Sequence, residues 1–234
     1  MSLKLSLQSI AIVSLMLLES SVTWAATVQV MAGWQNSKFL NGTNLTNGAP
    51  TAFIDADWSF DNNSFAGGNC YASSANRNEA VDVGCDFYIG YFKELNRNNA
   101  VSIQLTRHEY SRGLNRGWDF TDASLSWHVS KTSTLSVAVA KDWLGRPYDT
   151  FSVEAQKLIP LSSKIGLNVS ANVMGFDSGA PVNSLTTAKA SLTYNHRRWT
   201  TELGAIYTDG DQRNLFSFEI DQPDILFSIA YRLY

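Results

Sequence analysis

Along this chain, twelve segments of about ten residues alternate apolar and polar side chains, and the connections between the segments alternate between long and short. In the seventh segment, Leu135, Val137 and Val139 alternate with small or polar residues. A strict period of two over this length predicts strands that have one apolar face. Connections that alternate in length are typical of an up-and-down barrel that crosses an outer membrane, with short turns on one side and longer loops on the other.

The sequence therefore predicts an all-β fold, a single antiparallel transmembrane barrel of about twelve strands. The predicted strands are residues 27–37, 50–60, 64–74, 84–94, 99–110, 118–129, 133–143, 148–158, 163–175, 184–195, 198–208 and 222–233. An even number of strands places both termini on the same side of the membrane. Because the chain enters from the periplasm, we expect both termini and the short turns there, and the longer loops outside the cell.

The first 25 residues have the features of a secretory signal peptide. Lys4 supplies a positive charge, an apolar run extends from Ile10 to Leu18, and Thr23 and Ala25 are small residues at the cleavage positions. The run is too short for a membrane-spanning helix, although a retained N-terminal anchor is the alternative. We thus expect a cleaved signal peptide over residues 1–25 and an outer-membrane barrel over residues 26–234.

Composition is consistent with this location. Hydrophobic residues make up 44% of the chain and the mean hydropathy is −0.13, and a membrane barrel gives such values because every second strand residue faces water. The net charge of −3 argues against a nucleic-acid partner, which requires a basic face. The cysteines and histidines lack the spacing of a zinc site, and the sequence indicates neither a metal nor a cofactor.

A soluble β-sandwich or a lipocalin-like barrel also alternates apolar and polar positions. Loops of a sandwich need not alternate in length, and a sandwich has no reason to sort its aromatic residues into two rings. Rings of amphipathic aromatics at both interfaces are a feature of membrane barrels. The outer ring is predicted to contain Trp34, Tyr71, Tyr110, Trp118, Trp143 and Tyr207. The periplasmic ring is predicted to contain Trp58, Tyr91, Trp127, Tyr194, Trp199 and Tyr231.

Several motifs in the first 95 residues resemble a known family. They are Gly33-Trp34 through Gly42, Pro50 through Trp58, Phe65 through Ser73, and Asp86 through Tyr91. These segments resemble the proteobacterial Gcw_chp/TorF family of exported, uncharacterised proteins with predicted outer-membrane barrels. The resemblance implies the fold and location but no activity. Where that family usually carries an Arg-Gly pair in its first loop, this chain has Asn41-Gly42, so no role of that arginine carries over.

The two cysteines, Cys70 and Cys85, lie on the predicted third and fourth strands. An oxidising compartment favours a disulfide in an exported chain. We expect the bridge to join these strands beneath the second outer loop, and two free buried thiols are the alternative.

Alternation also assigns ionisable residues to the lumen of the barrel, because exposing Arg or Lys to lipid at mid-depth costs about 2–4 kcal/mol. The predicted lumen-lining residues are Asp55, Asp57, Asp86, Asp122, Glu154, Lys189, Glu202 and Arg232. One interpretation is a network of internal ion pairs that fills a narrow barrel. The other is a set of charges that determines which solute passes. A barrel of this size can hold a small-solute channel or be plugged by loops that fold inward.

The predicted outer loops carry five arginines, namely Arg77, Arg112, Arg116, Arg146 and Arg213. Arginines in this position can bind lipopolysaccharide phosphates through charge-assisted hydrogen bonds. They can also attract an anionic solute, or be solvated charges without a role.

Some outer-membrane barrels hydrolyse lipids, which requires a Ser–His pair near the outer leaflet. His128 and Ser130 lie at the periplasmic end, and His196 lies in a short turn beside arginines. His108 lies near the outer rim with Ser111, but no specific motif surrounds it. We therefore expect a non-enzymatic channel for a small polar solute, with a filled structural or surface-interaction barrel and a lipid hydrolase as alternatives. The expected partners are outer-membrane lipid, lipopolysaccharide and the barrel-assembly machinery.

Overall fold

A computed structural model describes residues 26–41, 43–46, 49–73, 82–110, 117–177, 179–209 and 224–234. The predicted signal peptide, residues 1–25, lies outside the described residues, and its cleavage stays a prediction.

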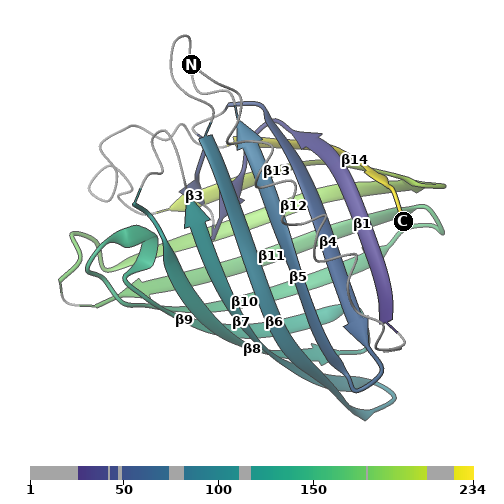
Figure 1. Cartoon of the computed structure of the whole chain (residues 1–234), viewed down its shortest axis with the longest axis horizontal. Helices are drawn as coiled ribbons and strands as arrows, with labels where there is room; N and C mark the ends of the chain where they lie inside the picture. Colours follow the sequence, from purple (N-terminus) through teal and green to yellow (C-terminus); the bar gives the residue numbers. More distant parts are fainter. Residues whose placement is uncertain are drawn as a thin grey trace, which may run out of the picture.

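Twelve antiparallel strands form a closed barrel, and two short strands form a separate hairpin inside the first long connection (Figure 1). The barrel strands are β1 (Ala26–Gln35), β4 (Thr51–Phe60), β5 (Ser64–Ser73), β6 (Asp82–Asn96), β7 (Asn99–Tyr110), β8 (Phe120–Val129), β9 (Ser133–Lys141), β10 (Thr150–Pro160), β11 (Ile165–Phe176), β12 (Ser184–His196), β13 (Trp199–Asp209) and β14 (Asp224–Arg232). The hairpin consists of β2 (Phe39–Leu40) and β3 (Thr43–Asn44). The predicted fold is confirmed, and every predicted strand boundary lies within two residues of the observed one.

The first and last strands close the barrel. β1 pairs antiparallel with β14, from Met31 opposite Arg232 to Gln35 opposite Ser228. Backbone hydrogen bonds from Leu233 N–H to the Val30 carbonyl (2.8 Å) and from Val30 N–H to the Tyr234 carbonyl (3.2 Å) extend this pairing to the C-terminus. Closure matters because an open sheet edge in lipid leaves its backbone polar groups without hydrogen-bond partners.

The connections alternate in length as predicted. Five of them, residues 61–63, 97–98, 130–132, 161–164 and 197–198, contain two to four residues each. Ser130 and Lys131 adopt left-handed backbone angles, with φ of 51° and 58°. Positive φ at both central residues is typical of the tight turns whose twist matches that of antiparallel strands. All the longer connections emerge at the opposite end of the barrel.

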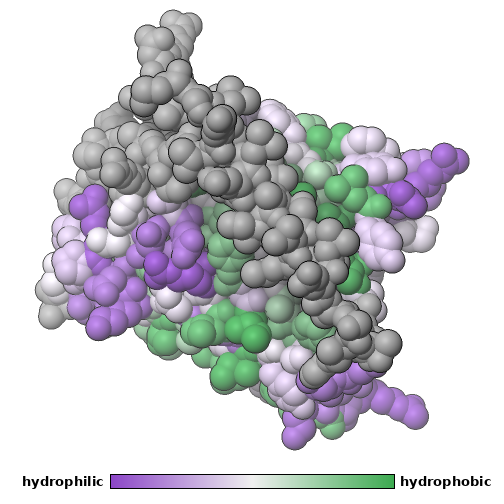
Figure 2. Space-filling view, in the orientation of Figure 1, coloured by the Kyte–Doolittle hydropathy of each residue, from purple (hydrophilic) through white to green (hydrophobic). Residues whose placement is uncertain are grey.

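The outer wall of the barrel is apolar. Ile89, Ile103, Leu125 and Leu203 are each more than half exposed, and each is one of an alternating set on its strand. In Figure 2, apolar residues cover the visible wall between hydrophilic residues at the two ends. No helix among the described residues is long and apolar enough to cross a membrane. An exposed apolar band on a closed barrel is the surface that outer-membrane barrels present to lipid.

The aromatic residues are only partly sorted as predicted. At the end with short turns, Tyr91, Trp127, Tyr194 and Trp199 are exposed on the outer wall, as expected for an interfacial ring. At the opposite end Trp34 and Tyr207 are also exposed there. The prediction was wrong for Tyr71, Tyr110, Trp118 and Trp143, which are buried inside the barrel mouth. Tyr71 and Tyr110 occupy inward strand positions, and Trp118 and Trp143 lie just outside the strands.

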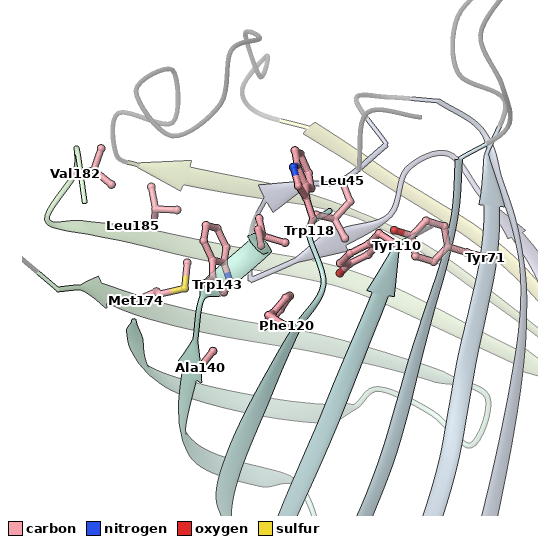
Figure 3. Close-up of a cluster of buried hydrophobic side chains, with 11 residues drawn as sticks. Leu45, Tyr71, Tyr110, Trp118, Phe120, Ala140, Trp143, Met174, Val182 and Leu185 are labelled. Atoms are coloured by element: carbon pink, nitrogen blue, oxygen red, sulfur yellow. The ribbon is translucent and has the colours of Figure 1, made fainter. Parts of the chain in front are cut away.

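These four aromatics belong to a buried apolar group that we call the mouth cluster (Figure 3). The mouth cluster consists of Leu45, Tyr71, Tyr110, Trp118, Phe120, Ala140, Trp143, Leu144, Met174, Val182 and Leu185. Trp143 and Leu144 come from a 3₁₀ turn, η3 (Trp143–Gly145), and Leu45 comes from the first long connection. The apolar core of this protein therefore lies inside the barrel at the end that carries the long loops.

The predicted disulfide between Cys70 and Cys85 is present. The two cysteines lie directly opposite each other on β5 and β6, next to the pair Asn69 and Asp86. Because Asn69 and Asp86 point into the lumen, as described below, the cysteines face the outer wall.

Replacing both cysteines by alanine is expected to lower the free energy of unfolding. The bridge closes a loop with a sequence separation of 15, and in the chain-entropy model a loop of that length contributes about 3 kcal/mol. Urea unfolding of the protein in lipid vesicles measures the difference. Equal stability of the C70A/C85A variant and of the unreduced protein would contradict this expectation.

Candidate functional site in the barrel lumen

All eight residues that were predicted to line the lumen occupy strand positions that alternate with the lipid-facing set. Asp55 and Asp57 flank Ala56 on β4, next to the exposed Ile54. The strand register places Asp55 opposite Asn69, and Asn69 opposite Asp86. The other inward residues are Asp122 on β8, Glu154 on β10, Lys189 on β12, Glu202 on β13 and Arg232 on β14.

The connection between β1 and β4, residues 36–50, which we call the first loop, folds into the barrel. Its hairpin is held by hydrogen bonds from Leu45 N–H to the Lys38 carbonyl (2.8 Å) and from Lys38 N–H to Thr46 Oγ1 (3.0 Å). At the hairpin tip, the Asn41 carbonyl accepts a long hydrogen bond from Thr187 Oγ1 (3.4 Å). Thr187 is on β12, three strands from β1 around the barrel. The first loop therefore reaches across the lumen.

The same loop is attached to the other side of the barrel through Lys38. Its Nζ donates a hydrogen bond to Asn69 Oδ1 on β5 (2.9 Å) and lies 3.4 Å from Asp86 Oδ2 on β6. It also lies 5.3 Å from the centre of the Tyr71 ring, within the range of a cation–π interaction. Together with Asn41, Lys38 fixes the first loop between opposite walls, which narrows the lumen.

His108 joins Asp86 to the next strands. Its Nδ1 is 2.7 Å from Asp86 Oδ1, and its Nε2 is 2.7 Å from Asp122 Oδ2. The imidazole stacks on Phe120 at 4.2 Å and its side chain is only 5% exposed. An ionised carboxylate can only accept hydrogen bonds. Two carboxylate partners therefore fit a protonated imidazole, which donates one hydrogen bond from each of its nitrogens.

At the other end of this network, Asn69 Nδ2 donates to Asp55 on β4. Two residues further along β4, Asp57 accepts a hydrogen bond from the hydroxyl of Tyr88. Gly67 makes room for the Tyr88 ring, because a Cβ at position 67 would overlap the ring and the hydroxyl. A continuous polar chain, which consists of Asp55, Asn69, Lys38, Asp86, His108 and Asp122, thus crosses five neighbouring strands and the first loop.

The remaining predicted lumen residues lie away from the polar chain. Lys189 on β12 forms an ion pair of 2.8 Å with Glu202 on the neighbouring strand β13. Among the described residues, Glu154 and Arg232 form no ion pair. Of the predicted loop arginines, Arg146 is exposed next to η3. The other four, at positions 77, 112, 116 and 213, lie outside the described residues.

The sequence interpretation missed three members of the polar chain, which are Lys38, Asn69 and His108. Asn69 was placed on a predicted strand but was not singled out. Lys38 was not singled out, since nothing local shows that the first loop folds inward. His108 was considered only beside Ser111, which lies outside the described residues. His108 is in fact saturated by two carboxylates and is not paired with a hydroxyl nucleophile.

His128 lies at an inward position of β8 and is not paired with Ser130, the serine considered from the sequence. Its Nε2 is 3.0 Å from Ser102 Oγ and its Nδ1 is 3.2 Å from Thr134 Oγ1. Ser130 lies in the turn, 3.5 Å from Thr132. A Ser–His pair without an orienting carboxylate lacks a part of the hydrolytic triad. Within the described part of the chain, no three histidine, cysteine, aspartate or glutamate residues are arranged to bind a metal ion.

No family model matches this sequence, and no curated protein matches it either. Solved structures similar in fold include the KdgM porin, with a TM-score of 0.57 and 8% sequence identity, over 89% of this chain and all of that chain. The KdgM porin in complex with disordered oligogalacturonate has a TM-score of 0.55 and 7% identity, with the same coverage. These similarities show a shared fold, that of an outer-membrane barrel.

Replacing His108 by alanine is expected to destabilise the barrel strongly. The change leaves two neighbouring carboxylates without their common partner, and breaking a buried pair in this way costs about 3–5 kcal/mol. Replacement by glutamine, which retains one donor group, is expected to cost less. Urea unfolding in lipid vesicles compares the two variants with the native protein. This expectation is contradicted if H108A unfolds at the same urea concentration as the native protein.

Proposed function

We propose that this protein is a porin-like outer-membrane channel that lets small polar solutes pass. The observation that carries the proposal is the polar chain across β4 to β8, which faces a lumen that the first loop narrows. Polar and ionised groups along an inward face, with a loop folded between opposite walls, provide a hydrated path with one selective constriction. The fold shared with a porin supports the same function.

The charges in the lumen favour cations over anions. Six inward carboxylates belong to the predicted set, and Glu94, at an inward position near a short turn, adds another. The inward cationic residues are Lys38, Lys189 and Arg232, with His108 as a fourth when it is protonated. An excess of one sign of charge in a low-dielectric pore attracts the opposite sign. The similar porin was solved in complex with oligogalacturonate, whereas the lumen of this chain favours cationic solutes.

The proposal includes an orientation and partners. Both termini and the short turns face the periplasm, and the mouth cluster lies at the cell surface. In this orientation the turn that carries Arg146 faces the cell surface, where the predicted loop arginines would contact lipopolysaccharide phosphates. The apolar wall is in contact with membrane lipid, and the barrel-assembly machinery inserts the chain. Protease accessibility of the long loops in intact cells tests this orientation.

A specific observation also favours a second candidate, a structural barrel with a filled lumen. The mouth cluster buries aromatic and aliphatic side chains where a channel would open, and Trp143 and Leu144 are fully buried there. In this alternative the polar chain serves only to pair charges inside the wall.

The purified protein in planar bilayers is expected to show discrete conductance steps with a preference for cations. Asp57→Asn and Glu154→Gln are expected to move the reversal potential in a salt gradient towards zero, because each removes an inward negative charge. Asp209→Asn is the matched control, since Asp209 is exposed at an outward position of β13. An electrically silent barrel that is also impermeable in liposome-swelling assays would favour the filled-lumen alternative.

Shortening the first loop is expected to raise the single-channel conductance. Gln35 and Thr51 are directly opposite each other on β1 and β4, so an Asn-Gly turn can replace residues 36–50 without disturbing the ladder. The change removes both Lys38 and the hairpin that spans the lumen. Unchanged conductance would show that the first loop does not form the constriction.

A further inference from the structure

The position of the Lys38 ammonium group has the properties of a binding site. Three features surround it: the amide oxygen of Asn69 at 2.9 Å, a carboxylate oxygen of Asp86 at 3.4 Å, and the face of the Tyr71 ring at 5.3 Å. A carboxylate, a neutral acceptor and an aromatic face together recognise a cation that also donates hydrogen bonds. Tyr71 is only 2% exposed, so its ring acts on the cation with little screening by water.

The wall residues of this site are held in place without Lys38. Asp86 is fixed by His108, and Asn69 is fixed by Asp55. Tyr71 packs over Gly84, where a Cβ would overlap the ring. By contrast, the group that fills the site comes from a loop, and Lys38 is the only charged residue between positions 36 and 50. The site is therefore part of the barrel wall, and its occupant comes from the first loop.

A second observation points to a ligand. Tyr110 is only 4% exposed, and its hydroxyl has no hydrogen-bond partner in the part of the chain that the structure describes. Its ring lies 6.5 Å from that of Tyr71 in the mouth cluster (Figure 3). A buried hydroxyl without a hydrogen-bond partner is unfavourable. A solute with a polar group beyond its ammonium could use this hydroxyl.

We propose that Asn69, Asp86 and Tyr71 form a binding site for a solute that carries a primary ammonium group, and that Lys38 occupies this site when the solute is absent. Binding of the solute displaces Lys38 and frees the first loop from β5 and β6. The part of this inference that concerns passage through the barrel rests on the proposed channel function, whereas the binding itself does not. Because Lys38 is tethered, its effective concentration is in the millimolar range, and a free amine must reach a similar concentration to compete.

Chemical rescue tests the site directly. Lys38→Ala keeps Cβ and removes the part of the side chain that corresponds to n-propylammonium. We expect n-propylammonium chloride to bind the folded K38A protein in detergent and to raise its melting temperature, and to bind the native protein at least about tenfold more weakly, since Lys38 competes. n-Propanol and tetramethylammonium chloride at matched ionic strength are expected to have no such effect, because one lacks the charge and the other lacks N–H donors.

Two variants make the result specific. Adding Asp86→Asn to K38A is expected to weaken n-propylammonium binding about tenfold, because it removes the negative charge that the ammonium group pairs with. Lys157→Ala is the matched control. Lys157 faces outward and contacts only the hydroxyls of Thr132 and Ser133 among the described residues, with no carboxylate. This variant is expected to gain no n-propylammonium binding.

The outcomes separate the site from the channel. In planar bilayers, K38A is expected to conduct more than the native protein, because its first loop is no longer attached to β5 and β6. n-Propylammonium is expected not to restore the lower conductance, because a free ammonium ion does not attach the loop again. If n-propylammonium binds K38A but the barrel shows no conductance, the proposed channel function is overturned and the proposed binding site is supported. Conductance without preferential binding of n-propylammonium to K38A, or equal binding of tetramethylammonium, would overturn the site and leave the channel standing.

Discussion

Pairing between β1 and β14 is the interaction on which the other features of this protein depend. Lipid offers no hydrogen-bond partner to a backbone, so a sheet can cross a membrane only if its first and last strands meet. Here they meet through the register from Met31–Arg232 to Gln35–Ser228. Closure then fixes two environments with opposite demands, because the side chains of each strand alternate between lipid and lumen. The carboxylates of the polar chain, which are unfavourable in lipid, therefore lie together on the inner surface.

The inner surface has two regions, one of paired ionised groups on the strands and one of apolar side chains at the mouth. Ionised groups on the strands find partners on neighbouring strands, as His108 does between Asp86 and Asp122. At the mouth, the long loops bring apolar side chains such as Leu45 and Trp143 together with inward strand residues, and these exclude water from one another. The first loop belongs to both regions, since Leu45 packs in the mouth cluster while Lys38 reaches the polar chain.

Strand positions and the inward side of Asp55, Asp86 and Asp122 could be predicted because a period of two is a local pattern. The side taken by aromatic residues near the outer rim could not. Tyr207 and Tyr71 each lie two residues before the end of their strand. Tyr71 turns inward because its ring fits over Gly84 and packs near Tyr110, and these are contacts between strands. Lys38 was unpredictable for the same reason, because its partner Asn69 is 31 residues away and the Thr187 that holds the hairpin tip is 146 residues from Asn41. A local sequence pattern does not indicate that a loop folds back into the barrel.

The disulfide on the outer wall has a consequence for its own chemistry. Cys70 and Cys85 are opposite each other on β5 and β6, and Cys85 is also opposite Glu109 on β7. Glu109 is exposed and lies 3.6 Å from Arg107, so the bridge lies at the edge of the apolar band, next to charged groups. Thiol–disulfide exchange proceeds through a thiolate, which water stabilises and hydrocarbon does not. At this level of the wall a soluble thiol can reach the sulfur atoms, so the covalent link between β5 and β6 responds to the redox state of the surroundings even after the barrel has closed.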